Sequence, residues 1–262
     1  MEFLREQKDS GMKGNKLALL WILFISLSAN AWESPWVSNW LVGASVGYGS
    51  RTGSNQTQFN LTGTQFPANY PSSLIIRDYS GPGSIVGLLM GYQSVKGNWL
   101  VGGEVNVDHH SMNEDLPFAF TDTNGAVGFN GVTNYKRDMV YGLTARAGYS
   151  IAPFFMFYVR AGMEWGYDTL STRYTGNPAV YPYGTEISTS TWVHRALSGF
   201  GVEMPLPMLC GASFRLEYNW HSKSKTLKAY GTVNDGLVSP SFVSTLQPQT
   251  HSAKAALIWN FF

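Results

Sequence analysis

The chain has 262 residues, of which 15% are aromatic and only 13% are charged, and it contains 28 glycines. Its 18 basic and 17 acidic residues leave a formal net charge of +1, without the basic patch that nucleic-acid binding requires. The single cysteine, Cys210, has no second cysteine with which to form an intramolecular disulfide. Low charge and high aromatic content therefore direct attention to a membrane protein rather than to a nucleic-acid-binding or disulfide-stabilised one.

The first predicted element is an export signal. From Met12, two lysines precede the apolar run LALLWILFISLS (17–28), and the small residues ANA follow, ending at Ala31. This order is typical of a secretory signal peptide, and the run is shorter than the roughly 20 residues of a membrane-spanning helix. We expect translation to start at Met12, cleavage after Ala31, a signal peptide within 1–31 and an exported domain over 32–262.

Eight later segments of about ten residues alternate between large apolar and small or polar side chains, which is the pattern of β-strands. The clearest are WLVGASVGY (40–48), WLVGGEVNVD (99–108), MVYGLTARAGY (139–149), FMFYVRAGMEWGY (155–167) and ASFRLEYNW (212–220), with weaker versions over 85–94, 193–204 and 252–262. A tilted strand of this length can cross a bilayer. We therefore predict eight transmembrane strands.

The two faces of these segments differ in a way that favours a membrane. Aromatic residues such as Trp40, Tyr48, Tyr141 and Tyr149 cluster at the segment ends of the apolar face, with smaller aliphatic residues between them. Two aromatic girdles around a hydrocarbon band produce this distribution. The opposite face carries glycines and charges, which could not form the core of a soluble β-sandwich.

The connections alternate between long and short. The short ones are VKGN (95–98), IAPF (151–154) and PLPMLC (205–210), and the four others are about 23 to 34 residues long. This alternation predicts an all-β, eight-stranded antiparallel up-and-down transmembrane β-barrel with four long extracellular loops and short periplasmic turns. Long connections such as 53–65 and 121–134, rich in Ser, Thr, Asn and Gly, are expected to be exposed loops that bind other molecules.

The chain ends on aromatic residues: Trp259 and Phe261 alternate with Asn260, and Phe262 follows. With this terminus the chain resembles the bacterial outer-membrane β-barrel superfamily, and in particular its eight-stranded porin-like and opacity-like surface proteins, including OmpA-like and OmpX-like barrels. The resemblance implies that Trp259, Phe261 and Phe262 form the signature read by the barrel assembly machinery. It also implies residence in the outer membrane, passage by periplasmic chaperones, and contact with outer-membrane lipid and lipopolysaccharide. It implies no cofactor.

Charged residues are expected to fill the interior of so narrow a barrel, where they must find partners. The predicted lumen network consists of Glu104, Arg146, Arg160, Glu164, Arg195, Glu203, Arg215 and Glu217. Two interpretations remain open. The network is either a structural plug or the lining of a polar path for small solutes.

The histidines of the chain suggest two further kinds of site. His109 and Ser111 have the His-x-Ser spacing that resembles the catalytic pair of lipid A-modifying barrels, with Glu114 as a candidate orienting carboxylate. Four histidines lie near strand–loop junctions: His109, His110, His221 and His251. No carboxylate or cysteine spacing accompanies them to form a metal site. We therefore expect no catalytic, metal or cofactor site.

Together these features predict an integral outer-membrane barrel with an envelope-structural role and a surface-interaction role of the adhesin or antigen kind, with a possible host or surface ligand bound by the loops. The alternative is a small porin that passes small solutes through a charged lumen. A lipid A-modifying enzyme is the third hypothesis.

Overall fold

A computed structural model describes residues 36–60, 73–121, 127–176, 185–232 and 241–261. The predicted signal peptide, its cleavage site and Phe262 lie outside the described residues. The strands are β1 (Val37–Asn60), β2 (Ser73–Lys96), β3 (Trp99–His110), β4 (Glu114–Thr121), β5 (Val127–Ala152), β6 (Phe155–Gly176), β7 (Thr185–Pro205), β8 (Ala212–His221), β9 (Leu227–Thr232), β10 (Ser241–Leu246) and β11 (Gln249–Phe261). None of the described residues form a helix long and apolar enough to cross a membrane.

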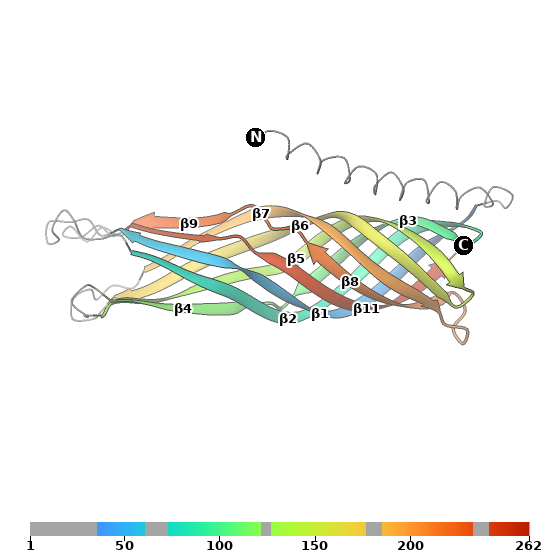
Figure 1. The fold of residues 1–262 in the computed structure, drawn as a ribbon, viewed down its shortest axis with the longest axis horizontal. Helices are drawn as coiled ribbons and strands as arrows, with labels where there is room; N and C mark the ends of the chain where they lie inside the picture. The colour runs from blue at the N-terminus through green and yellow to red at the C-terminus, as the bar shows by residue number, and fades with distance from the viewer. Residues whose placement is uncertain (1–35, 61–72, 122–126, 177–184, 233–240, 262) are drawn as a thin grey trace, which may run out of the picture.

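The strands close into a barrel, as predicted. Its wall runs β1-β2-β3-β5-β6-β7-β8-β11 with every neighbouring pair antiparallel, and β11 pairs with β1 to complete the ring (Figure 1). Short turns join β2 to β3, β5 to β6 and β7 to β8 at the end where the chain terminates. Gly97 and Gly211 adopt positive φ angles of 58° and 75° in two of these turns, which other residues rarely adopt. The expected eight-stranded up-and-down architecture is therefore confirmed.

The outer face of the barrel is an apolar band bounded by aromatic rings. Aliphatic side chains such as Val46 and Leu88 are 61% and 67% exposed. At the periplasmic end Trp40 contacts Tyr92 edge-on, with their ring centroids 5.1 Å apart. At the other end Trp192 contacts both Tyr141 and Tyr167. Aliphatic surface of this extent would be unfavourable in water, whereas a bilayer accommodates it.

The strands continue well beyond the outer aromatic girdle, which the sequence did not predict. β1 extends to Asn60 and β5 begins at Val127, so much of the two segments expected to be loops, 53–65 and 121–134, is strand. In this region the pattern of the two faces is reversed, because Leu170 and Ile187 point inward while Ser54 and Gln56 are exposed. A strand surrounded by water has its apolar side chains inside.

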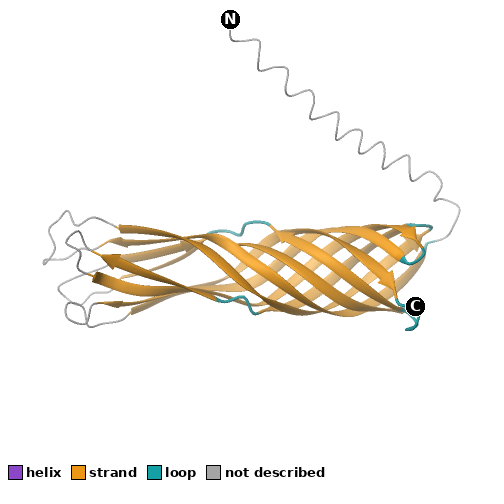
Figure 2. Ribbon diagram, turned by 60° about the horizontal axis from the view of Figure 1, so that its bottom comes forward, coloured by secondary structure: helices purple, strands orange, loops and turns teal. Residues whose placement is uncertain are grey.

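Beyond the girdle the wall separates into two sheets. Residues 111–113 lead from β3 into β4, which pairs with β5, and residues 222–226 lead from β8 into β9, which pairs with β10. Both breaks are seen as loop segments midway along the barrel in Figure 2. The resulting sheets, β9-β10-β1-β2 and β4-β5-β6-β7, enclose a core of their own. Its residues are Tyr79, Leu116, Phe118, Tyr135, Leu170, Ile187, Val193, Leu227, Ala229 and Leu246. We call this part of the molecule the outer sandwich.

Candidate functional site

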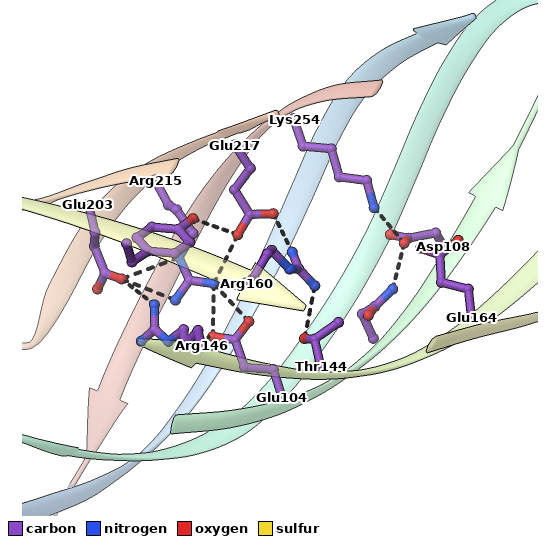
Figure 3. A network of polar contacts seen from close by, with 12 residues as sticks. Glu104, Asp108, Thr144, Arg146, Arg160, Glu164, Glu203, Arg215, Glu217 and Lys254 are labelled. Carbon is purple, nitrogen blue, oxygen red and sulfur yellow. Dashed lines mark hydrogen bonds and ion pairs between the residues drawn. The ribbon is translucent and has the colours of Figure 1, made fainter. Parts of the chain in front are cut away.

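The lumen within the membrane is crossed by ion pairs (Figure 3). At its centre, Arg215 on β8 is fully buried and contacts three glutamates, which lie on β3, β7 and β8 itself. Its Nη1 lies 2.9 Å from Glu104 Oε1 on β3 and 3.4 Å from Glu217 Oε1, and its Nη2 lies 3.1 Å from Glu203 Oε2 on β7. Because β3 and β8 are not neighbours in the wall, the Arg215–Glu104 pair closes the bore.

Two more arginines complete this group. Arg146 Nε lies 3.1 Å from Glu104, its Nη1 lies 2.7 Å from Glu203, and it also donates to Gln93. Arg160 pairs with Glu217 at 2.5 Å and donates to Thr144 Oγ1 at 3.0 Å. We call Glu104, Arg146, Arg160, Glu203, Arg215 and Glu217 the lower charge layer. Three arginines face three glutamates, so the layer carries no net charge.

The aromatic ring of Tyr158 organises the lower charge layer. Its hydroxyl donates to Glu217 Oε1 at 2.6 Å, and the guanidinium carbons of Arg146 and Arg215 lie 5.4 and 5.5 Å from the ring centroid. Cations stacked on an aromatic face are attracted by its quadrupole. The ring therefore contacts two arginines while its hydroxyl binds the glutamate that pairs with Arg160.

The other two predicted residues belong to different contacts nearer the cell surface. Arg195 Nη2 lies 2.7 Å from Asp168 Oδ2, and Glu164 Oε2 lies 3.0 Å from His221 Nε2. The structure thus places all eight predicted residues in the lumen but divides them between two groups. The second group, which we call the upper charge layer, also holds side chains that the prediction omitted: Arg51, Asp108, Arg137, Asp168, His221 and Lys254.

Period-2 alternation could have found most of the omitted residues. Asp108 lies on the polar face of its predicted segment, two residues after Asn106. Asp168 lies one residue beyond its predicted segment, where the same alternation continues. Arg137 does not follow the pattern, because a β-bulge between Arg137 and Val140 reverses the alternation ahead of the segment 139–149. Lys254 forms a 2.5 Å ion pair with Asp108 and comes from the weakly patterned last strand. Arg51, Arg137, Asp168 and His221 were missed because the predicted strands were too short, whereas Asp108 and Lys254 lie within predicted strands and were left out of the predicted network.

Apolar side chains also fill the lumen. Leu41, Leu89, Ala256 and Ile258 form a buried cluster on β1, β2 and β11, where Ala256 is opposite Arg215 of the lower charge layer in the β11–β8 register. Beyond the charge layers, at the outer end, lies the core of the outer sandwich. The described part of the lumen is therefore filled by two charge layers with an apolar cluster beside the lower one, and by the apolar core of the outer sandwich.

The predicted His-x-Ser pair lies on the outer surface, and Ser111 and Glu114 both form hydrogen bonds with β2. The Ser111 hydroxyl lies 2.7 Å from the Ser84 hydroxyl, and Glu114 Oε2 accepts a hydrogen bond from the Ser80 backbone N–H at 2.9 Å. Glu114 is therefore bonded to the backbone of β2. His109 borders an apolar hollow of about 530 Å³ on the membrane-facing side.

The other histidines lie on different faces of the wall. His110 and His221 point into the lumen, whereas His251 lies on the outer face, where Tyr218 Oη is 3.0 Å from its Nδ1. His221 and His251 therefore do not converge. Among the described residues, no group of three His, Cys, Asp or Glu side chains is arranged to hold a metal ion.

The last strand places its aromatic side chains at the periplasmic interface. Trp259 and Phe261 are 40% and 45% exposed on the outer face, and they pair with Val42 and Trp40 of β1. Ile258 is fully buried in the lumen. The outward alternation expected of the terminus is therefore present up to Phe261.

A closed eight-stranded barrel with an aliphatic exterior, two aromatic girdles and a charged interior is a transmembrane β-barrel. Its fold is that of the β-barrel proteins of the bacterial outer membrane.

No protein-family model matches the chain, and no curated protein matches it in sequence. Solved structures that are similar to it include Ail, the attachment invasion locus protein of Yersinia pestis, at 13% identity and a TM-score of 0.27, covering 81% of this chain and 97% of Ail. OprG of Pseudomonas aeruginosa is 9% identical with a TM-score of 0.39, over 83% and 95% of the two chains. The outer-membrane protease OmpT of Escherichia coli is 9% identical with a TM-score of 0.41, over 84% and 97%.

Proposed function

We propose that this protein is a closed outer-membrane barrel that supports the envelope and presents its outer sandwich to molecules at the cell surface, as adhesins and surface antigens do. The observation that carries the proposal is the lower charge layer. Its six side chains are almost completely buried, and their charges cancel across the bore. A path for solutes would require these pairs to separate, at a cost of several kcal/mol for each buried charge left without a partner.

The outer sandwich supports the surface-interaction part of the proposal. Its strands project beyond the outer girdle, and within the described strands no backbone ladder joins β2 to β4 or β7 to β9. Strand edges of this kind present unpaired backbone groups to a partner. Near the β2–β4 boundary, a hollow of about 420 Å³ is bordered by Arg77 and Arg173 over Pro117 and Phe118.

This hollow combines an apolar floor with two guanidinium groups, and because Arg173 pairs with Glu186 at 3.2 Å, an anionic partner would compete with Glu186 at that position. Lipopolysaccharide and acidic segments of host or surface proteins are the partners we propose. We also propose that the barrel assembly machinery and periplasmic chaperones bind Trp259 and Phe261. The outward position of these two side chains on the last strand supports this proposal.

We further propose that the barrel is not an enzyme. Ser111 and Glu114 are engaged by Ser84 and by the backbone of Ser80, so a proton relay from Ser111 through His109 to Glu114 would require these contacts to break. Unchanged lipid A in cells that gain or lose the protein is the expected result. A modification that disappears with His109→Ala would contradict it.

Single-channel conductance tests the main proposal. Protein refolded in detergent and shown to be folded by heat-modifiable migration should give a silent planar bilayer. An Arg146→Ala/Glu203→Ala variant opens space beside Arg215 but leaves the upper charge layer and the core of the outer sandwich in place, so it should remain silent as well if it folds. Discrete channels from the unmodified protein would instead establish the small-porin alternative.

A further inference from the structure

Arg51 is the exception to the charge pairing of the lumen. It lies on β1, fully buried, and its guanidinium carbon lies 5.0 Å from the centre of the Tyr135 ring. Its Nη1 donates to the Met112 carbonyl oxygen at 3.1 Å, and its Nη2 lies 3.5 Å from His110 Nδ1. Within the described part of the chain, no carboxylate forms an ion pair with it. Arg215 is equally buried but has three such partners.

Arg51 is connected to the rest of the upper charge layer through Tyr135. The Tyr135 hydroxyl donates to Asp168 Oδ2 at 2.7 Å and accepts from Arg195 Nη2 at 3.0 Å. Arg137 Nε lies 2.9 Å from the other oxygen of Asp168. The Asp168 carboxylate is thus shared by Arg137 and Arg195. Arg51 stacks on Tyr135, whose hydroxyl donates to the same carboxylate.

The charges of the upper layer do not cancel. Its cations are Arg51, Arg137, Arg195 and Lys254, and its carboxylates are Asp108, Glu164 and Asp168. With His221 and the adjacent His110 counted as neutral, four positive charges face three negative ones. The lower charge layer has three of each sign.

Several hydrogen-bond donors around Arg51 lack an acceptor, and of the acceptors in this layer Glu164 Oε1 and Oε2 and the Tyr79 hydroxyl also lack a hydrogen-bond partner among the described residues. An arginine only donates, so His110 Nδ1 must accept in its contact with Arg51, and the proton of the neutral ring is then on Nε2. Among the described residues, His110 Nε2 and Arg51 Nε have no hydrogen-bond partner, and the same holds for Nη1 and Nη2 of Arg137. A buried charge without a counterion is strongly destabilising, and so is a buried donor without an acceptor.

We propose that the upper charge layer binds a small monovalent inorganic anion of the chloride class beside Arg51 and His110. The anion accepts hydrogen bonds from the N–H groups of the Arg51 guanidinium and the His110 imidazole. Its negative charge offsets the one positive charge of the upper charge layer that the three carboxylates leave uncompensated. The site lies at the junction between the membrane barrel and the outer sandwich. It therefore makes the stability of the junction depend on the anion present.

The test compares unfolding in two sodium salts of equal ionic strength. Protein is refolded in detergent with either chloride or the bulky anion gluconate, and unfolded with urea, since guanidinium chloride would itself supply the ligand. A ligand that binds only the folded state raises the urea midpoint with its concentration. The midpoint of the unmodified protein should rise with chloride and not with gluconate.

Arg51→Met removes the excess charge while keeping most of the volume. We expect this variant to lose the chloride dependence and, in gluconate, to be at least as stable as the unmodified protein. Arg146→Met is the matched control, a buried lumen arginine with two glutamate partners, and it should lower the midpoint equally in both salts while retaining the response to chloride.

Two results would overturn the proposal. One is an unmodified protein whose midpoint is the same in both salts. The other is an Arg51→Met variant that is less stable than the unmodified protein by the same amount in both. If the variant does not fold, crystals of the unmodified protein grown in bromide decide the matter. An anomalous bromide peak beside Arg51 and His110 supports the site, and a lumen without such a peak refutes it.

Discussion

Arg215 and Glu104 are 111 residues apart in the sequence and lie on non-adjacent strands, yet their side chains meet at 2.9 Å inside the lumen. Both are almost completely buried, at 0% and 3% exposure. The contact therefore ties one side of the barrel to the other through its interior rather than through the backbone ladder of the wall.

Arg215→Met should lower the free energy of unfolding by about 3–5 kcal/mol, because it leaves buried glutamates without their shared partner. Urea unfolding followed by tryptophan fluorescence measures the loss. Arg173→Met is the control, because its pair with Glu186 is 3.2 Å long but exposed, at 75% and 51%. The control should change stability by less than about 1 kcal/mol. Equal losses in the two variants would mean that the lower charge layer contributes no more than a surface pair.

Glycines at inward positions allow neighbouring strands and side chains to approach closely. Gly162 is the glycine whose added Cβ would collide most closely with backbone atoms of a neighbouring strand. A Cβ there would collide with the Leu143 carbonyl oxygen and lie 2.7 Å from Thr144 Cα. Gly162→Ala should therefore destabilise the barrel by about 1–3 kcal/mol, because the obstacle is backbone that cannot rotate away.

Gly103 provides the matched position for this comparison. It is an exposed strand glycine, and the nearest atom to its added Cβ would be 3.9 Å away. Gly103→Ala should leave the unfolding midpoint unchanged or raise it slightly, since alanine has less conformational freedom in the unfolded chain. A larger loss in Gly103→Ala than in Gly162→Ala would contradict the packing described for the two faces.

Tyr79 gives the outer sandwich a dependence on alkaline pH. It lies beyond the outer girdle, and burial raises the pKa of its hydroxyl to about 12 against the opposing effect of the Arg51 guanidinium. Because the folded-state pKa is raised, the neutral phenol contributes its full stability below about pH 10, the pKa of an unfolded tyrosine. That contribution is lost as the pH rises from about 10 through about 12.

The titration can be assigned by difference. Phenolate absorbance of the unmodified protein minus that of Tyr79→Phe should show one group ionising near pH 12. A difference curve centred near the ordinary tyrosine value would show that Tyr79 is hydrated rather than packed against Tyr135.

The outer sandwich should respond to mutation separately from the membrane barrel. Leu170 is fully buried in the core of the sandwich, so Leu170→Ala should cost about 2–5 kcal/mol locally. In outer-membrane vesicles we expect faster proteolysis of the extracellular part, with heat-modifiable migration of the barrel retained. Leu143→Ala, at a lipid-facing position that is 54% exposed, should leave proteolysis unchanged. Loss of heat-modifiability in Leu170→Ala would show that the two parts unfold together.

The membrane barrel could be predicted because lipid selects one face of every strand so strongly. Val42 to Gly47 on β1 alternates between aliphatic side chains outward and glycine or serine inward, a pattern that a lipid-facing strand favours. The short turns at 97–98 and 153–154 then fixed the order of the strands. The outer sandwich could not be found in the same way. Its inward face mixes Leu170 with the polar Thr172, and its outward face is the Ser- and Thr-rich composition of an exposed loop.

The pairing within the lumen was beyond reach for a different reason. Alternation places Glu104 and Arg215 inside, but their meeting depends on strand tilt and register around the whole ring, which no local pattern contains. The same holds for Arg51. Its inward position follows from alternation, whereas its lack of a carboxylate partner follows only from where Asp108, Glu164 and Asp168 lie.

The two sheets of the outer sandwich differ in how far apart their strands lie along the chain. The sheet β4-β5-β6-β7 consists of consecutive segments, so it can form from successive hairpins. The sheet β9-β10-β1-β2 joins the two ends of the chain, with Asn55 opposite Leu246, and continues the seam at which β11 meets β1. Contacts between distant segments form late because they close large loops. The sheet β4-β5-β6-β7 can therefore form early in assembly. The sheet β9-β10-β1-β2 is completed only when β11 pairs with β1 and closes the barrel.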